Sequence, residues 1–282
     1  MVRRSWAIAE RLSWPWLLAR LLSRGAGTAH GLIEETISFG DDPAQHVLVV
    51  RSEHLSNARP LVYFIHGGSW KHGDPELFRA VGRFFAHYGY TTALGGYRHV
   101  PRHLFPAQRD DVFAGISAVM QEGWFAEACD GSVLLAGQSA GGHLAALVAF
   151  DEDSRADAGL GDLDIAGVLA VSGVLDFGVL CPTGARCPLV EGLMGGREGW
   201  EYADPAFYVH GSPRVPVLCL HGSRDPLVPV EVAASFVLRA NGSDGDHAVF
   251  MADPDAHHSD MTRLFFGTSP LTGAMLDWMG DL

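Results

Sequence analysis

Short apolar runs recur along the chain, and segments whose apolar positions repeat at helical spacing lie between many of them. The apolar runs have the length of buried β-strands and cover residues 46–50, 61–67, 91–97, 133–137, 166–173, 217–222 and 247–253. The helical segments cover residues 75–89, 108–123, the stretch after position 139, 230–242 and 269–282. Apolar strands that alternate with helices predict an α/β fold, with a mainly parallel sheet and helices on both faces.

The first 45 residues precede this alternation, and we assign them to an N-terminal helical segment ahead of a catalytic domain over 46–282. Apolar residues at 14, 17, 18, 21 and 22 predict an amphipathic helix, with Ser13 as N-cap and Gly25 past its end. Charged residues interrupt the segment, so it does not have the pattern of a membrane span or a clear cleaved leader. We expect it to pack on the catalytic domain. A lid, a dimer contact and a weak membrane-surface contact through its arginines remain open alternatives.

Residues 174–212 also break the alternation, because this stretch is rich in glycine, proline and isolated aromatic residues. A long excursion between two strong strands commonly has a functional role. We interpret it as a cap-like, pocket-forming insert of the catalytic domain.

Composition narrows the possible partners and the compartment. The formal charge of −13 argues against a nucleic-acid partner, since phosphate binding needs clustered lysine and arginine. The cysteines at 129, 181, 187 and 219 lack metal-site spacing. Reduced thiols and a cytoplasmic location are the default expectation, although Cys181 and Cys187 could form a disulfide in an oxidising compartment. The sequence does not indicate an oligomeric state.

Ser139 lies at the centre of Gly137-Gln138-Ser139-Ala140-Gly141, between a predicted strand and a predicted helix. A strand, a sharp turn and a helix are the context of a nucleophile elbow, in which small neighbours allow a strained serine to project from the turn. A glycine-rich turn with an incidental serine is the alternative.

Candidates for the other parts of a serine-hydrolase site also follow predicted strands. His66-Gly67-Gly68 could present backbone N–H groups to an oxyanion, Asp225 could orient a base, and His257 or His258 could be that base. The alternatives are an ordinary Gly-Gly turn, an Asx turn and a solvated histidine. The order Ser, Asp, His is the chain order of α/β-hydrolases.

With these residues the chain resembles α/β-hydrolases of the hormone-sensitive-lipase-like and kynurenine-formamidase-like esterase group. The motifs that carry the resemblance lie in this order between residues 61 and 260: HGGSW, GYRHVPRHLFPAQRDDV, GQSAGGHLAAL, HGSRDPLVP and HHSDM. The resemblance implies Ser139 as nucleophile, Asp225 as acid and His258 as base, with backbone N–H groups of Gly67, Gly68 and Ala140 as oxyanion hole. One departure is Gln138, where hormone-sensitive-lipase-like enzymes typically have aspartate.

The expected function is hydrolysis of a carboxylic ester through an acyl-enzyme, without a metal or an organic cofactor. Phe64, Trp70 and Tyr97 favour a medium-sized apolar or aromatic substrate, although such residues are more often core than pocket. Hydrolysis of an N-formyl amide and acyl transfer remain open, because both use the same acyl-enzyme. A non-catalytic ligand-binding scaffold is an alternative of a different class. We predict that His258 is the base because a helix with Ser259 as N-cap would anchor it, and that His257 is solvated.

Overall fold

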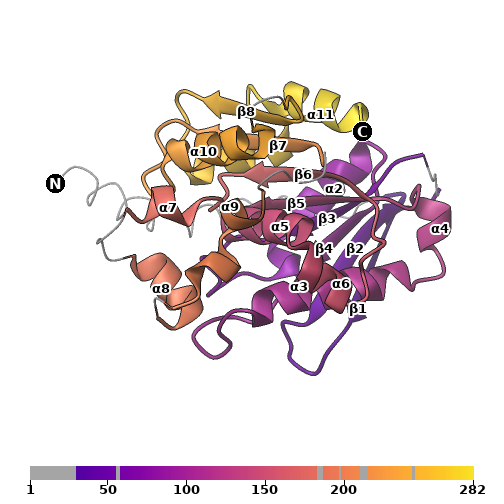
Figure 1. Cartoon of the computed structure of the whole chain (residues 1–282). Coiled ribbons are helices and arrows are strands. Elements are labelled where there is room, and N and C mark those ends of the chain that lie inside the picture. Colours follow the sequence, from indigo (N-terminus) through magenta and orange to yellow (C-terminus); the bar gives the residue numbers. More distant parts are fainter. Residues whose placement is uncertain (1–29, 55–57, 183–186, 197, 210–214, 243–244) are drawn as a thin grey trace.

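In the part of the chain that the structure describes, eight strands form one sheet in the order β1-β2-β4-β3-β5-β6-β7-β8 (Figure 1). The computed structural model describes residues 30–282 except 55–57, 183–186, 197, 210–214 and 243–244. β1 and β2 are antiparallel to their neighbours, and the other strands are parallel. The strands are β1 Leu32–Ser38, β2 His46–Ser52, β3 Leu61–Ile65, β4 Thr92–Gly95, β5 Val133–Gln138, β6 Ile165–Val171, β7 Val217–Gly222 and β8 Ala248–Asp253.

The mainly parallel sheet with helices on both faces is confirmed, and each of the seven apolar runs overlaps one of the strands β2 to β8. β1 was not predicted, because its sequence LIEETIS carries two glutamates and it lies at the edge of the sheet, half exposed. The sheet therefore begins at Leu32, inside the segment that we assigned to the N-terminal region. The amphipathic helix expected over residues 14–22 lies outside the described residues.

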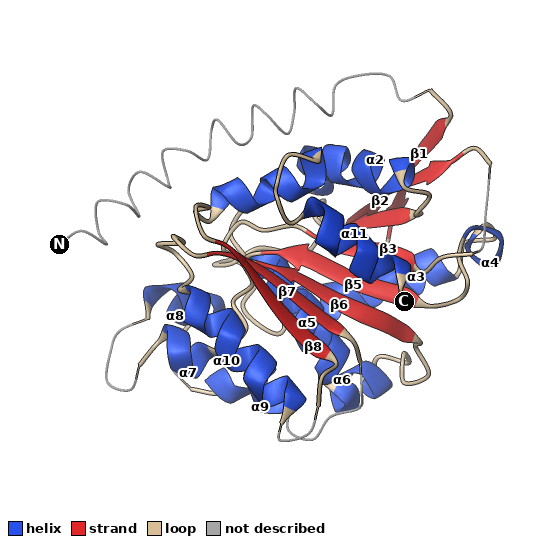
Figure 2. Ribbon diagram, turned by 90° about the horizontal axis from the view of Figure 1, so that it is seen from above, coloured by secondary structure: helices blue, strands red, loops and turns tan. Residues whose placement is uncertain are grey.

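The sheet separates two apolar cores, because successive side chains of a strand point to opposite faces. In β3, Tyr63 and Ile65 face one core and Phe64 faces the other. Helices α2 and α11 cover one face, and α3, α5 and α10 cover the other (Figure 2). The α-helices are α2 Arg79–His87, α3 Ala107–Met120, α4 Phe125–Ala128, α5 Ala140–Phe150, α6 Glu152–Asp157, α7 Phe177–Leu180, α8 Pro188–Met194, α9 Pro205–Tyr208, α10 Val230–Asn241 and α11 Thr272–Gly280. The 3-10 helices of the described residues are η1 Pro75–Phe78, η2 Trp200–Ala203 and η3 Ser259–Phe266.

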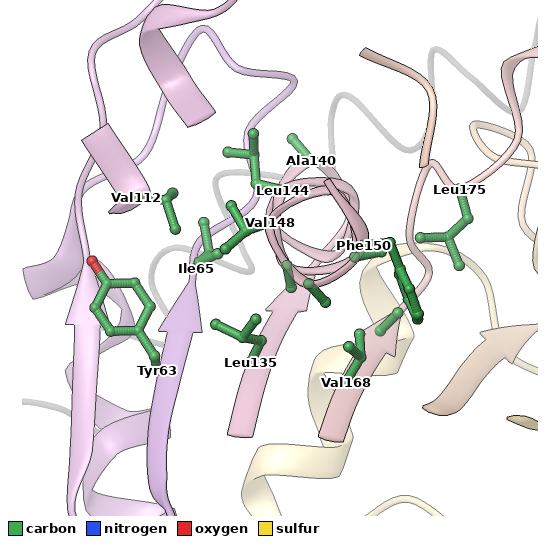
Figure 3. Close-up of a cluster of buried hydrophobic side chains, with 14 of the residues drawn as sticks. Tyr63, Ile65, Val112, Leu135, Ala140, Leu144, Val148, Phe150, Val168 and Leu175 are labelled. Atoms are coloured by element: carbon green, nitrogen blue, oxygen red, sulfur yellow. The ribbon is translucent and has the colours of Figure 1, made fainter. Parts of the chain in front are cut away.

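Helix α5 is the central helix of the larger core, and every one of its residues is buried. Figure 3 shows Leu144 and Val148 of α5 lying against Ile65 of β3 and Leu135 of β5. This packing fixes the start of α5 over the carboxyl ends of β3 and β5. Among the described helices, none combines the length and the apolar character that a membrane span requires.

The insert over 174–212 forms α7, α8, η2 and α9. Its buried side chains, Phe177, Val190, Leu193 and Ala203 among them, belong to the same core as α5. The described part of the insert therefore packs as part of the catalytic domain.

Cys181 and Cys187 form a disulfide, so the expectation of reduced thiols is wrong for this pair. Their Cα atoms are 5.6 Å apart, because α7 ends and α8 begins at neighbouring points of the insert; this separation lies within the range that a disulfide spans. Cys129 and Cys219 are free and buried, as expected. Disulfides persist mainly in oxidising compartments, so this pair weighs against the cytoplasmic location, which stays a prediction.

Asp111 of α3 holds the loop after β4 in place. Its buried carboxylate accepts hydrogen bonds from the Arg98 backbone N–H, from the Arg98 guanidinium and from Gln45 Nε2. The shortest donor–acceptor distance is 2.8 Å for each of these three donors. Replacing Asp111 with alanine would leave these donors unpaired, and we expect a loss of about 3 kcal/mol in the free energy of unfolding.

Chemical denaturation with Asp110→Ala as the matched control tests this expectation. Asp110 is the neighbouring residue, but its side chain is 51% exposed and pairs with Arg109, so its loss should cost less than about 1 kcal/mol. Equal losses in the two variants would contradict the structural role given to Asp111.

Candidate active site

The sequence-predicted residues follow four strands whose carboxyl ends meet at one edge of the sheet. Ile65 at the end of β3 pairs with Gly137 of β5, and Gly222 at the end of β7 pairs with Asp253 of β8. The loops after these strands therefore lie at the same edge, which is where open α/β sheets bind ligands.

Ser139 connects the end of β5 to the start of α5 in a left-handed backbone conformation, with φ 58° and ψ −117°. Its backbone N–H donates to the Val171 carbonyl at 2.8 Å. A Cβ at Gly141 would lie 2.7 Å from the His66 carbonyl oxygen, and one at Gly137 would lie 2.7 Å from the Gly142 nitrogen. Small residues are therefore required on both sides of Ser139, and the strained turn has the geometry of a nucleophile elbow.

The loop after β3 lies beside this turn. A Cβ added to Gly67 would be 3.3 Å from the Ser139 Cβ, so the Gly67 backbone lies next to the serine side chain. Ala140 is the first residue of α5, where backbone N–H groups have no partner within the helix. Gly67 and Ala140 thus flank Ser139 from two elements, the arrangement that backbone donors to an oxyanion require.

His66 holds the Gly67 loop in place. Its Nδ1 is 2.9 Å from the Gly67 carbonyl oxygen, and its ring stacks on Tyr97 with centroids 4.4 Å apart. Tyr97 also donates its hydroxyl hydrogen bond to the His66 carbonyl at 3.1 Å. Burial lowers the pKa of His66 to about 3, so this ring is neutral beside the loop. Phe64, Trp70 and Tyr97 are core residues and carry no information on substrate size.

Asp225 and His258 form a close pair. His258 Nδ1 is 2.6 Å from Asp225 Oδ2, while Asp225 Oδ1 accepts the backbone N–H groups of Leu227 and Val228 at 2.9 Å. Burial alone would raise the pKa of Asp225, but the positive charge available on His258, together with hydrogen bonds from the His258 and His221 rings, holds it well below its usual range. Asp225 is therefore ionised, and it fixes His258 with the proton on Nδ1 and the lone pair on Nε2.

His221 is a site residue that the sequence reasoning missed. It is fully buried in β7, and its Nε2 lies 2.9 Å from the Val228 carbonyl oxygen and 3.2 Å from Asp225 Oδ2. His221 thus contacts Asp225 Oδ2, the same oxygen that faces His258 Nδ1. The spacing of four residues between His221 and Asp225 in HGSRD was the available signal, but an isolated histidine has no predicted partner without the fold.

The two adjacent histidines have different partners. His257 Nδ1 is 3.2 Å from Asp260 Oδ2, and the same oxygen accepts the His257 backbone N–H at 2.9 Å. The prediction of Ser259 as N-cap is wrong, because His258 occupies the cap position and Ser259 is already the first residue of η3. His258 is nevertheless held at the start of that helix.

The insert reaches the first turn of α5 through His143, four residues after Ser139. His143 Nε2 is 2.6 Å from the Ala203 carbonyl oxygen, and its ring stacks on Phe177 at 5.4 Å and contacts Trp70 edge-on at 5.0 Å. Burial lowers the pKa of His143 to about 4. The insert is thus packed one helical turn from Ser139.

Within the described ranges, His46, Asp74 and Glu76 form a group with ligand atoms close enough to hold a metal ion. His46 Nε2 already pairs with Glu76 Oε2 at 3.0 Å, and Asp74 caps η1 by accepting the Glu76 backbone N–H. None of the three contacts Ser139, Asp225 or His258 in the described structure, and acyl transfer by a serine needs no metal at this position.

Several known proteins with similar chains are named as esterases. Esterase LipC of Mycobacterium tuberculosis is 30% identical over 244 residues, which cover 79% of this chain and 58% of LipC. Isoprenylcysteine alpha-carbonyl methylesterase ICME of Arabidopsis thaliana is 23% identical over 267 residues, which cover 89% of this chain and 61% of ICME. The chain thus spans about three fifths of the length of these relatives.

Solved structures agree with the fold. Esterase B of Lactobacillus rhamnosis, in an inhibited form, superposes with a TM-score of 0.76 at 24% identity and covers 97% of this chain and 96% of its own. A bacterial heroin esterase superposes with a TM-score of 0.71 at 21% identity, and the match covers 95% of this chain and 88% of the heroin esterase chain. The α/β-hydrolase fold that the motifs implied is therefore confirmed. The sequence model of the family described as BD-FAE matches residues 49–239, more than half of the chain, and the chain belongs to that family.

Proposed function

We propose that this chain is a serine hydrolase that cleaves a carboxylic ester through an acyl-enzyme. The observation that carries the proposal is the Asp225–His258 pair at 2.6 Å, at the same sheet edge as the strained Ser139. The names of the relatives support it, since LipC and ICME are both described as esterases.

The reaction proceeds in two halves. In the first, Ser139 Oγ attacks the acyl carbon and passes its proton to His258 Nε2, while backbone N–H groups of Gly67, Gly68 and Ala140 bind the oxyanion. His258 then protonates the leaving alkoxide, which departs as the alcohol. In the second, His258 takes a proton from water, the hydroxide attacks the acyl carbon, and Ser139 recovers its proton as the acid leaves.

The proposed substrate has a medium-sized apolar or aromatic group, and the insert would contact it. Support comes from the position of the insert, because Phe177 and Ala203 pack on His143 one turn from Ser139. The exposed aromatic residues Tyr202 and Phe207 add apolar surface to the insert. A weak membrane-surface contact through the N-terminal segment remains a proposal.

Reaction with a fluorophosphonate, followed by intact-mass measurement, tests the nucleophile without knowledge of the natural substrate. We expect one adduct per chain in the native protein and none in Ser139→Ala. A folded native protein that forms no adduct would support a non-catalytic scaffold.

The same preparation should hydrolyse p-nitrophenyl acetate and p-nitrophenyl butyrate. If it turns over an N-formyl aryl amide with a higher kcat/KM than either ester, the amide-hydrolase alternative replaces the esterase.

A further inference from the structure

Gln138 lies between two parts of the proposed site. It is the last residue of β5, it directly precedes Ser139, and only 1% of its surface is exposed. Its side-chain Nε2 is 3.5 Å from His258 Nε2. On its other side, a Cβ added to Gly67 would overlap the Gln138 amide oxygen. The Gln138 amide therefore fills the space between the Gly67 loop and the His258 ring.

The proton positions follow from the partners of the two groups. His258 Nδ1 faces the ionised Asp225 carboxylate at 2.6 Å, so Nδ1 carries the proton of the neutral ring and Nε2 carries a lone pair. The amide group turns its NH₂ to this lone pair and its oxygen to Gly67, so Gln138 occupies Nε2 until the Ser139 hydroxyl donates to the same atom. At 3.5 Å the Gln138 N–H donates a long, weak hydrogen bond to the atom that would accept the Ser139 proton.

We propose that Gln138 is a positioning residue that holds the His258 ring in place and favours its neutral form, which alone can act as a base. The proposal rests on the proposed function, because it assigns His258 the role of base. A hydrogen bond to the neutral form of a group disfavours the charged form, so Gln138 lowers the pH at which His258 becomes protonated. Asparagine is too short to reach, and a carboxylate at position 138 would have the opposite effect.

Four titratable groups of the described residues lie near His258, and each is either Asp225, in contact with Asp225, or paired on the loop of His258. Asp225 faces Nδ1, not Nε2, and His221 contacts the same carboxylate oxygen, Asp225 Oδ2. On the loop of His258 itself, the His257 ring forms a hydrogen bond with the Asp260 carboxylate. A change at position 138 therefore acts on the Nε2 side of the ring, where these four groups make no described contact.

The test measures the His258 pKa directly, by NMR titration of histidine-labelled protein, with His258→Ala used to assign the signal. Gln138→Glu has the same size and places a carboxylate at Nε2, so we expect the His258 pKa to rise by about one unit or more. Gln138→Met removes the hydrogen bond without adding charge, and we expect a smaller rise. Gln121→Glu, on the exposed end of α3, adds the same charge away from the site and should leave the pKa unchanged.

The pH dependence of kcat/KM on p-nitrophenyl butyrate gives a second readout. The acid limb of the profile should move to higher pH in Gln138→Glu, with at least a tenfold loss of activity below the midpoint and little change in KM. A His258 pKa that stays within about 0.2 units of the native value in both variants would overturn the proposal. Because the titration needs no turnover, it tests Gln138 even if the native protein forms no fluorophosphonate adduct, an outcome that would instead overturn the proposed function.

Discussion

Replacing Ser139 with alanine is expected to lower kcat/KM for p-nitrophenyl butyrate by about 10⁴-fold or more. The substitution removes the oxygen that attacks the acyl carbon, and any remaining rate would come from substrate binding and from the oxyanion donors. The backbone should not change, because alanine keeps the Cβ that serine already carries at φ 58°. We therefore expect a thermal midpoint within a few degrees of the native value, with the loss confined to turnover.

Ser172→Ala is the matched control for this experiment. Ser172 follows β6, the strand beside β5, and it also has a left-handed backbone, with φ 48°. It is fully buried, so the substitution removes a hydroxyl from another position of positive φ without removing the proposed nucleophile. We expect its activity to stay within about tenfold of the native value. Native turnover in Ser139→Ala would reject Ser139 as nucleophile.

The central strands could be predicted from the sequence because parallel strands are buried on both faces and read as continuous apolar runs. β7, VLCLHG, is an example, since all six of its residues are buried. β1 gave no such signal, because an edge strand has one neighbour and tolerates Glu34 and Glu35 on its surface. Glu34 instead pairs with Arg79 and Arg83 of α2, a contact that appears only when the sheet is assembled.

The sequence also indicated where the site residues lie, because each follows an apolar run and parallel strands end at a common edge. It could not indicate their partners. Gln138 and His258 are 120 positions apart, and only the pairing of β5 through β8 brings them to 3.5 Å. His221 and Asp225 are close in sequence, but their contact depends on the turn after β7. The Cys181–Cys187 disulfide could be predicted only for an oxidising compartment, and the composition does not specify the compartment.

The adjacent histidines allow the base to be identified by a pair of single substitutions. We expect His258→Ala to lower kcat for p-nitrophenyl butyrate by about 10³-fold or more, as for loss of a triad member, because the variant has no group to take the Ser139 proton. His257→Ala should stay within about tenfold of native activity. The His257 side chain is 28% exposed and its ring contacts the Asp260 carboxylate. The His258 side chain is 8% exposed and its ring contacts the Asp225 carboxylate.

Each substitution removes one imidazole that contacts one carboxylate, and the two histidines directly precede η3, so the two variants are matched in chemistry and position. Thermal midpoints should be recorded with the rates, because a loss of stability in His258→Ala alone would lower activity without identifying the base. If both variants are folded, the ranking of their rates decides the assignment. A larger loss in His257→Ala would move the base to the histidine that contacts Asp260. Asp225, His221 and Gln138 would then surround a ring that takes no proton from Ser139, and the roles given to all three would fail together.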